Sequence, residues 1–233
     1  MKRLAFAILV LAAFPQAHAA GGGGHAVESV DIDLSNKASL QRGAQVFANY
    51  CVSCHSAKFM RYARLAEDLE LTPEQVQEHL IFGAGTVQDS MDVAMQAEEA
   101  EKWFGVPPPD LSLTARARGS DWLYAYLKGF YIDESATMGV NNAVFPDVAM
   151  PHVLVGLQGE QHMVDGHLEL AEPGALSPEE YDGLVRDLVA FLTYVGEPAK
   201  LERYGLGFKV LMFLLVMTGL MYLVKREYWK DVH

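Results

Sequence analysis

Two thiols and an imidazole stand together near residue 50, in the run Cys51-Val52-Ser53-Cys54-His55. The Cys-x-x-Cys-His spacing is the attachment signature of a c-type haem, because two thiols one helical turn apart can add to the two vinyl groups on one haem edge. The histidine that follows lies under the iron and supplies an axial nitrogen. The sequence therefore predicts one covalently attached haem c, held by Cys51, Cys54 and His55.

Two other chemistries use paired cysteines, and both fit this sequence less well. A structural zinc site needs about four ligands, and Cys51 and Cys54 are the only 2 cysteines of the chain. A redox dithiol of the thioredoxin type needs a βαβ context, which the hydrophobic pattern around residue 50 does not indicate. The sequence therefore favours a covalently attached haem over a zinc site or a redox dithiol.

A haem that only carries electrons needs a second axial ligand opposite His55, and a methionine gives it a higher potential than a second histidine does. Of the 10 methionines, one lies in the N-terminal leader, three lie in an apolar segment near the C-terminus, and Met60 follows His55 too closely to reach the other haem face. The candidates that remain are Met91, Met95, Met138, Met150 and Met163.

Met150 is the ligand we favour, because it precedes Pro151 in an irregular loop that is far from His55 in the sequence. A loop lets a thioether point inward without the constraints of helix geometry. Met138 is its main competitor. His152 is a weaker alternative, and we expect it to be an ordinary surface histidine.

The segment that must position the thiols is predicted to be a helix from about residue 35 or 36 to residue 50. Gly43, Phe47 and Cys51 follow one another at four-residue steps, so they share one helix face. A glycine on that face lets another helix approach closely, and the aromatic side chain fills space beside the haem. This run resembles the N-terminal helix of the class I cytochrome c fold.

Further elements follow from local signals. Capping boxes predict helices that begin at Thr72-Pro73 and at Ser177-Pro178, the first ending at Gly83 and the second carrying an apolar stripe over 181–195. A helix from Ser120 is rich in aromatic residues, which either wall the haem or form plain core. Asp165-Gly166 predicts a small β-hairpin over 161–170, whereas residues 133–160 show no strong period.

Both ends of the chain carry membrane-related signals. Residues 1–19 predict a cleaved secretory signal peptide, with Lys2-Arg3, an apolar run and Ala17-His18-Ala19. Residues 206–224 are apolar except for Lys209 and span about 28 Å as a helix, the thickness of a bilayer core. Since the leader exports the chain, we expect a periplasmic haem domain over 20–205, a transmembrane helix over 206–224 and a cytoplasmic tail over 225–233.

The exported part is strongly acidic. The whole chain has a net charge of -12; without the two basic leader residues and the net +2 of residues 206–233, residues 20–205 carry -16. This charge argues against nucleic acid as a partner and favours a basic soluble protein. The acidic residues within 86–101 are interpreted as a solvated face, with a docking surface as the sharper alternative.

Taken together, these motifs resemble the cytochrome c1 family in a bacterial form, over nearly all of the mature chain. The resemblance depends on the haem motif followed by Arg61-Tyr62, on the single C-terminal span, and on the following runs: Pro108-Pro109-Asp110-Leu111-Ser112, Ala117-Arg118-Gly119 and Pro146 to Pro151 around Met150. It implies a mainly α, class I cytochrome c-like haem domain with long loops and a small β-hairpin, plus one C-terminal transmembrane helix.

The resemblance also implies roles and partners. Cys51 and Cys54 would hold the haem, His55 and Met150 would ligate the iron, and Arg118 would pair with a haem propionate, with Arg116 as its competitor. The chain would pass electrons from the Rieske iron–sulfur protein to a soluble c-type cytochrome, beside cytochrome b in the quinol:cytochrome c oxidoreductase of the cell inner membrane, and would be no enzyme in isolation. Another monohaem carrier subunit, or a haem enzyme or gas sensor with an open iron site, remains as the alternative.

Overall fold

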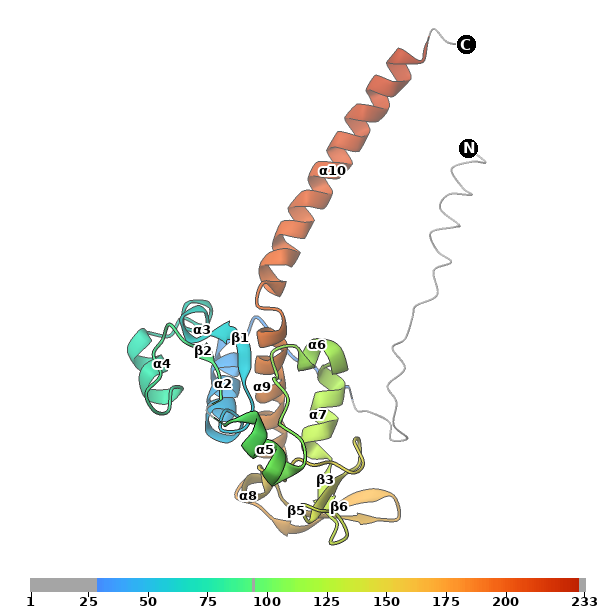
Figure 1. Ribbon diagram of the computed structural model, residues 1–233. Helices are drawn as coiled ribbons and strands as arrows, with labels where there is room; N and C mark the ends of the chain where they lie inside the picture. The colour runs from blue at the N-terminus through green and yellow to red at the C-terminus, as the bar shows by residue number, and fades with distance from the viewer. Residues whose placement is uncertain (1–28, 94, 231–233) are drawn as a thin grey trace.

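The computed structural model describes residues 29–93 and 95–230 of this chain. The helical elements form a domain from which one long helix projects, and three separate two-stranded antiparallel sheets complete it (Figure 1). The helices of the domain are α2 (Lys37–Tyr50), α3 (Tyr62–Leu69), α4 (Pro73–His79), α5 (Ala97–Phe104), α6 (Thr114–Arg118), α7 (Ser120–Lys128), α8 (Val155–Gln158) and α9 (Pro178–Gly196). The predicted signal peptide over 1–19 lies outside the described residues.

The centre of the domain is the contact between α2 and α9, which lie side by side in Figure 1. A Cβ atom on Gly43 would lie 2.1 Å from the carbonyl oxygen of Asp187, so the two backbones approach each other as only glycine allows. The rings of Phe47 and Phe191 meet beside this point, with centroids 5.6 Å apart. The close approach predicted at Gly43 is confirmed, and it fixes the position of the α2 end that carries the thiols.

Both predicted capping boxes are present. In α9, the Ser177 hydroxyl accepts from the backbone N–H of Glu180 while the Glu180 carboxylate accepts from that of Ser177. Thr72 and Gln75 do the same at the start of α4. The predicted stripe of α9 is buried, except for the partly exposed Leu184. The prediction that the first of these helices reaches Gly83 is wrong, because the chain leaves helical geometry after His79 and turns to bury Leu80 and Ile81.

The three sheets are small. The predicted hairpin consists of β5 (Gly159–Val164) and β6 (His167–Pro173), and positive φ values at Asp165 (50°) and Gly166 (81°) confirm the turn. The pairs β1 (Ala57–Arg61) with β2 (Ser90–Met91) and β3 (Phe130–Ile132) with β4 (Val140–Asn142) are not predicted by the sequence pattern. The acidic side chains of α5 and of the segment before it are exposed, which fits both a solvated face and a docking surface.

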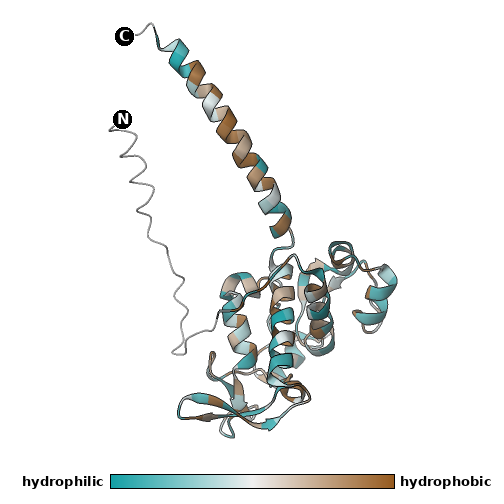
Figure 2. Ribbon diagram, turned by 180° about the vertical axis from the view of Figure 1, so that it is seen from behind, coloured by the Kyte–Doolittle hydropathy of each residue, from teal (hydrophilic) through white to brown (hydrophobic). Residues whose placement is uncertain are grey.

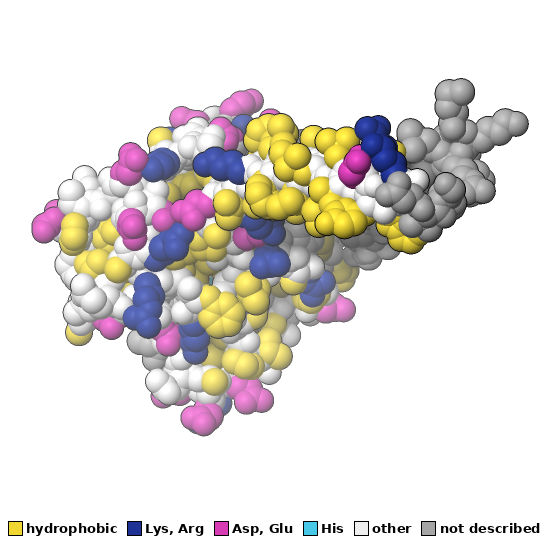
Figure 3. All heavy atoms as spheres, turned by 90° about the horizontal axis from the view of Figure 1, so that it is seen from above, with side chains coloured by type: hydrophobic (Ala, Val, Ile, Leu, Met, Phe, Trp, Pro, Cys, Tyr) yellow, Lys and Arg dark blue, Asp and Glu magenta, His cyan; other side chains and the backbone are white. Residues whose placement is uncertain are grey.

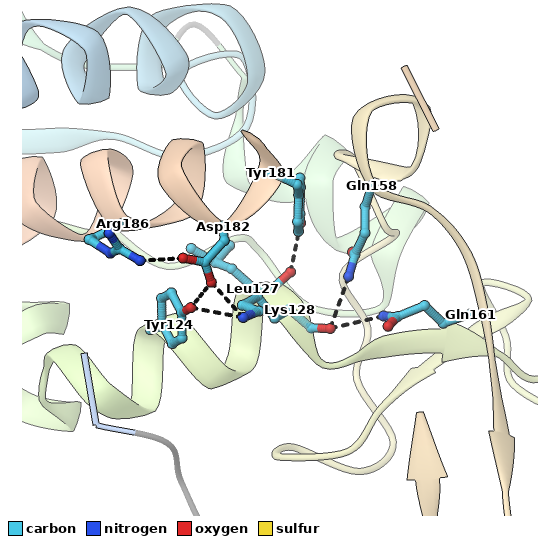
Figure 4. Close-up of polar contacts among 8 residues, drawn as sticks. All are labelled: Tyr124, Leu127, Lys128, Gln158, Gln161, Tyr181, Asp182 and Arg186. Carbon is cyan, nitrogen blue, oxygen red and sulfur yellow. Dashed lines mark hydrogen bonds and ion pairs between the residues drawn. The ribbon is translucent and has the colours of Figure 1, made fainter. Parts of the chain in front are cut away.

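A polar network fastens the end of α7 to its surroundings (Figure 4). The Asp182 carboxylate of α9 binds Tyr124, Arg186 and the ammonium of Lys128, the last at 2.7 Å. The backbone carbonyls at this end accept further bonds from the side chains of Tyr181, Gln158 and Gln161. Since Gln158 ends α8 and Gln161 lies in β5, this network sets where the chain that follows residue 150 is held.

The projecting helix is α10 (Lys200–Tyr228), whose 29 residues extend about 44 Å. It contains the predicted 206–224 segment and begins earlier, after the break at 197–199. Apolar residues cover its length and basic residues gather at its far end, where Lys225 and Arg226 lie (Figures 2 and 3). Within the described chain it is the one helix long and apolar enough to cross a bilayer, and none of its residues is buried against the domain. Over residues 29–93 and 95–230 the protein thus has one transmembrane helix, at the C-terminal end.

Candidate haem-binding site

The two thiols stand at the end of α2, where the chain continues for one more turn. Cys51 caps the helix through a bond from its N–H to the Phe47 carbonyl, and the N–H groups of Cys54 and His55 donate to the Cys51 carbonyl at 3.0 and 2.8 Å. Both cysteines are unpaired and line one cleft together with His55. The Cys-x-x-Cys-His run therefore presents two thiols and an imidazole to the same space.

The environment of Cys51 is unlike that of a redox dithiol. Desolvation by burial, with a smaller contribution from Cys54, raises the pKa of the Cys51 thiol to about 12, whereas reactive redox thiols have lowered pKa values. A zinc site is also unsupported, because no group of three or more His, Cys, Asp or Glu side chains converges within residues 29–93 and 95–230. The haem interpretation is the one that this donor set fits.

The His55 ring is held in one tautomer. Its Nδ1 lies 2.8 Å from the carbonyl oxygen of Pro109, and since a carbonyl only accepts, Nδ1 carries the hydrogen and Nε2 keeps its lone pair. Burial lowers the pKa of His55, which keeps the ring neutral. In metal-bound histidines in general, the ring nitrogen that does not bind the metal donates a hydrogen bond. His55 Nδ1 is in this position, which leaves Nε2 for the metal.

The segment around Pro109 is bound to the chain that follows the haem motif. The Asp110 carboxylate accepts from the Ser56 hydroxyl at 2.7 Å and from the Lys58 and Ser112 N–H groups at 3.0 and 2.8 Å. The Ser112 hydroxyl accepts in turn from the N–H of Phe59 at 3.1 Å. These bonds explain physically why Pro-Pro-Asp-Leu-Ser accompanies Cys-x-x-Cys-His-Ser in one chain.

Met150 lines the same cleft as His55, although the two are far apart in the sequence. The Tyr126 hydroxyl donates to its Sδ atom at 3.4 Å. Within the described chain, the other four candidate methionines are not part of the cleft lining. Met138 packs against a small cluster of Phe130, Val140 and Val148, which Met150 also contacts, but Met138 itself does not line the cleft.

His152 does not lie free at the surface, and that expectation is wrong. Its ring stacks on Phe130 with centroids 4.9 Å apart and planes 4° apart, and its Nε2 atom is buried. Burial lowers the pKa of His152 to about 4. The partner of His152 is Phe130 of β3, which is distant from His152 in the sequence. The residues next to His152 therefore give no sign of this contact.

The two candidate arginines differ in their surroundings. The exposed Arg118 guanidinium lies 5.0 Å from the ring centroid of Trp122 and 5.9 Å from that of Phe145, and no carboxylate of the described chain pairs with it. Arg116 instead lays its aliphatic stem against α9, where a Cβ on Gly196 would meet Arg116 Cγ at 3.2 Å. Arg116 is likewise exposed, and no carboxylate of the described chain pairs with its guanidinium either, so the charges of both arginines are available.

The cleft itself encloses about 530 Å³, counting the space at its open mouth. Its lining consists of Tyr50, Cys51, Cys54, His55, Phe104, Val106, Pro108, Pro109, Ala149, Met150, Pro151 and Val153. An apolar lining with few polar atoms suits a flat, largely apolar group, so the residues present fit a haem. Of the aromatic residues expected from the 120–131 stretch, Tyr126 reaches the site through Met150. Trp122, Tyr124 and Phe130 pack in the hydrophobic clusters, whereas Tyr131 is partly exposed.

Four lining residues escape sequence reasoning: Tyr50, Phe104, Val106 and Val153. Tyr50 directly precedes the first thiol, and this adjacency is the signal that could have found it. Phe104 and Val106 flank the left-handed Gly105 (φ 78°), which ends α5 and turns the chain toward the prolines. No motif in the sequence marks that turn as part of the site.

Comparisons with known proteins agree with this geometry. The Cytochrome C1 family matches residues 31–232. Cytochrome c1 of Allochromatium vinosum is 50% identical over 245 residues, covering 100% of both chains, and a Nitrosomonas europaea protein named ammonia monooxygenase gamma subunit is 46% identical, again over 100% of both. Mitochondrial cytochrome c1 of Neurospora crassa is 30% identical over 82% of this chain and 61% of its own. The chain belongs to the cytochrome c1 family, whose members carry one covalently attached haem c.

Proposed function

We propose that this chain transfers electrons from the Rieske iron–sulfur protein to a soluble c-type cytochrome within a quinol:cytochrome c oxidoreductase. The observation that carries the proposal is the apolar cleft that brings Cys51, Cys54, His55 and Met150 together in a member of the cytochrome c1 family. When bound, the haem supplies a reversible one-electron change of its iron. The chain makes and breaks no substrate bond, so it works as an electron-transfer subunit.

Each site residue has a proposed role. Cys51 and Cys54 would hold the haem through thioether bonds, His55 would ligate the iron through Nε2, and Met150 would ligate it through Sδ. The bond from His55 Nδ1 to the Pro109 carbonyl oxygen (2.8 Å) orients the imidazole even without a bound haem. With both His55 and Met150 bound to the iron, no position would be left for an added ligand, and the apolar lining of the cleft would exclude water.

Arg118 is proposed to pair with a haem propionate, with Arg116 as the alternative. A guanidinium forks well onto a carboxylate. The contact of Arg118 with the Trp122 ring at 5.0 Å holds its charged group in place while leaving its N–H groups available.

The proposed membrane arrangement follows the sequence boundaries. Residues 1–19 act as a removed signal peptide, 20–205 form a periplasmic domain, 206–224 cross the inner membrane and 225–233 remain in the cytoplasm. Basic residues flank both ends of the span, with Lys200, Arg203 and Lys209 on one side and Lys225, Arg226 and Lys230 on the other, so the proposed orientation depends on the export signal and not on the positive-inside tendency. In this arrangement α10 contacts cytochrome b within the bilayer.

The name of the Nitrosomonas relative gives a rival proposal, in which the chain serves an oxygenase complex. We would purify the tagged full-length chain from membranes in mild detergent, identify its partners and add a reduced quinol. Co-purification with cytochrome b and the Rieske protein, and quinol-driven reduction of added cytochrome c, support our proposal. Oxygenase subunits as partners support the rival, and rapid carbon monoxide binding to the reduced protein indicates an open-site enzyme or sensor.

A further inference from the structure

The hydroxyl of Tyr126 has an unusual partner. It donates to the thioether sulfur of Met150 at 3.4 Å, and a thioether is a weak acceptor. Tyrosine hydroxyls that are removed from water generally find a hydrogen-bond partner, and among the described residues this sulfur is the one that Tyr126 binds. The pairing therefore places a donor against an atom that proteins seldom use as an acceptor.

The ring of Tyr126 is fixed on several sides. It stacks on Trp122 with centroids 5.0 Å apart and planes 12° apart. The ring of Phe130 meets it edge-on at 5.3 Å, and that of Phe145 lies at 6.5 Å. A tyrosine held in this way has little freedom to turn its hydroxyl elsewhere, so the O–H group has a defined direction.

The same helix also holds the segment that leads to Met150. The Asn142 side-chain amide donates to the Tyr126 carbonyl at 2.8 Å. The side-chain oxygen Oδ1 of Asn142 accepts from the N–H groups of Val144 and Phe145 at 2.9 and 3.1 Å. The Tyr126 carbonyl thus binds the segment that precedes Met150, and the Tyr126 hydroxyl binds the Met150 sulfur itself. These two contacts hold the hydroxyl and the sulfur at a fixed distance from each other.

We infer that Tyr126 is a positioning residue that orients the Met150 sulfur toward the iron and raises the potential of the haem. A thioether sulfur has two lone pairs, and a hydroxyl bound to one of them leaves the other for the metal. The bond also withdraws electron density from the sulfur, so the sulfur stabilises Fe(III) less. This inference rests on the proposed ligation of iron by Met150.

The test compares Tyr126→Phe with Tyr124→Phe in the full-length haem-loaded protein. Both changes remove one hydroxyl from α7 and keep the ring, but the Tyr124 hydroxyl binds Asp182 and Lys128 instead of the sulfur. We would measure the midpoint potential, the NMR shifts of the haem methyl groups in the ferric protein, and the unfolding temperature. The methyl shifts report the orientation of the axial sulfur.

For Tyr126→Phe we expect a lower midpoint potential and a changed pattern of methyl shifts. For Tyr124→Phe we expect an unchanged potential and a lower unfolding temperature, since a bond between α7 and α9 is lost. The inference would be overturned if Tyr126→Phe left both the midpoint potential and the haem methyl NMR shifts unchanged. It would also be overturned if the two variants changed the potential and the methyl shifts equally. A wild-type protein without the near-infrared band of sulfur-ligated ferric haem would instead contradict the proposed Met150 ligation itself.

Discussion

His55 Nδ1 donates a hydrogen bond to the carbonyl oxygen of Pro109 across 2.8 Å. The donor belongs to the haem motif and the acceptor to a proline run more than fifty residues later. Because proline fixes φ, consecutive prolines give this acceptor a rigid backbone. The two motifs therefore form one unit, in which the second orients the proposed iron ligand of the first.

Asp110 should be the residue that keeps this unit together. Desolvation would raise its pKa, but bonds from Ser112, Lys58 and Ser56 outweigh that effect and hold the pKa below its ordinary 3.8. A carboxylate with a depressed pKa contributes stability above that ordinary value and loses it as pH falls through the folded-state pKa. We expect Asp110→Asn to cost about 1–3 kcal/mol at neutral pH and to weaken the loss of stability below about pH 4.

Thermal unfolding followed between pH 2.5 and pH 7 (an assay range chosen to bracket roughly the carboxylate titration) measures both effects. Asp92→Asn is the matched control, since Asp92 is exposed, lies 3.5 Å from Lys58 and accepts a local bond from the Val93 N–H at 2.8 Å, but does not bind Ser56 or Ser112. It should leave neutral-pH stability within about 0.5 kcal/mol of wild type. Equal effects of the two substitutions would mean that Asp110 has no special part in holding the proline run.

Gly43 is expected to tolerate no side chain. A Cβ there would lie 2.1 Å from the Asp187 carbonyl oxygen and 2.7 Å from Phe191 Cβ, so Gly43→Ala must push α2 and α9 apart. Overpacking of this kind costs about 1–3 kcal/mol or more. On α9, Gly183→Ala is the control, because no atom lies within 4 Å of its new Cβ; it should stabilise by about 0.5–1 kcal/mol. Denaturant unfolding measures both, and similar values would contradict the close-approach argument.

The elements that the sequence predicts are those with local signals. The start of α9 is marked by a capping box and its length by a steady apolar stripe, and the hairpin turn is marked by Asp165-Gly166. The pairs β1–β2 and β3–β4 have strands of two to five residues, which are too short to show a period. Their pairing depends on contacts between distant segments, and no local pattern encodes these.

The site divides in the same way. Cys51, Cys54 and His55 are predicted by spacing alone, because their chemistry needs consecutive turns of one chain. Met150 needs elimination and a family resemblance, since only the fold brings it to the cleft. The bond from Tyr126 and the stacking of His152 on Phe130 depend on side-chain packing between elements, so sequence reasoning could not find them.

The acidic face of α5 should steer a basic electron acceptor. Glu98 and Glu101 are exposed on the helix whose last residue, Phe104, lines the cleft. Charge reversal to Lys at both should lower the association rate with a basic cytochrome about tenfold at low salt. Rates should converge near 1 M salt, where the Debye length is about 3 Å. Stopped-flow mixing measures this.

Glu67→Lys with Glu78→Lys is the control for that experiment. It changes the same amount of charge on α3 and α4, which do not contribute to the cleft lining. We expect a smaller decrease in rate. If both pairs lower the rate equally, net charge alone matters, and a rate insensitive to salt would show that the acidic surface serves solubility.

Removing α10 should leave the haem domain folded. None of its residues is buried against the described domain, and a stop after Tyr204 retains the ion pair between Arg203 and Glu197 at 2.8 Å. The truncated chain should appear in the soluble fraction, retain haem on a denaturing gel and unfold within a few degrees of the full-length protein, since the core contacts are unchanged. A well-expressed truncated chain without haem would contradict this two-part architecture.

Met150→Leu should abolish sulfur ligation and leave haem attachment intact. Leucine keeps the bulk of the side chain, whereas the soft thioether that stabilises Fe(II) is lost. The near-infrared band of the ferric protein should disappear, the midpoint potential should decrease, and carbon monoxide should bind the reduced iron faster because a position has opened. Met138→Leu is the matched control, since Met138 packs with Phe130 and Val148 outside the cleft, and should keep the band. If the band were lost in the Met138 variant and kept in the Met150 variant, Met138 would be the ligand. Both variants replace one methionine with leucine, so they differ only in the position that loses its sulfur.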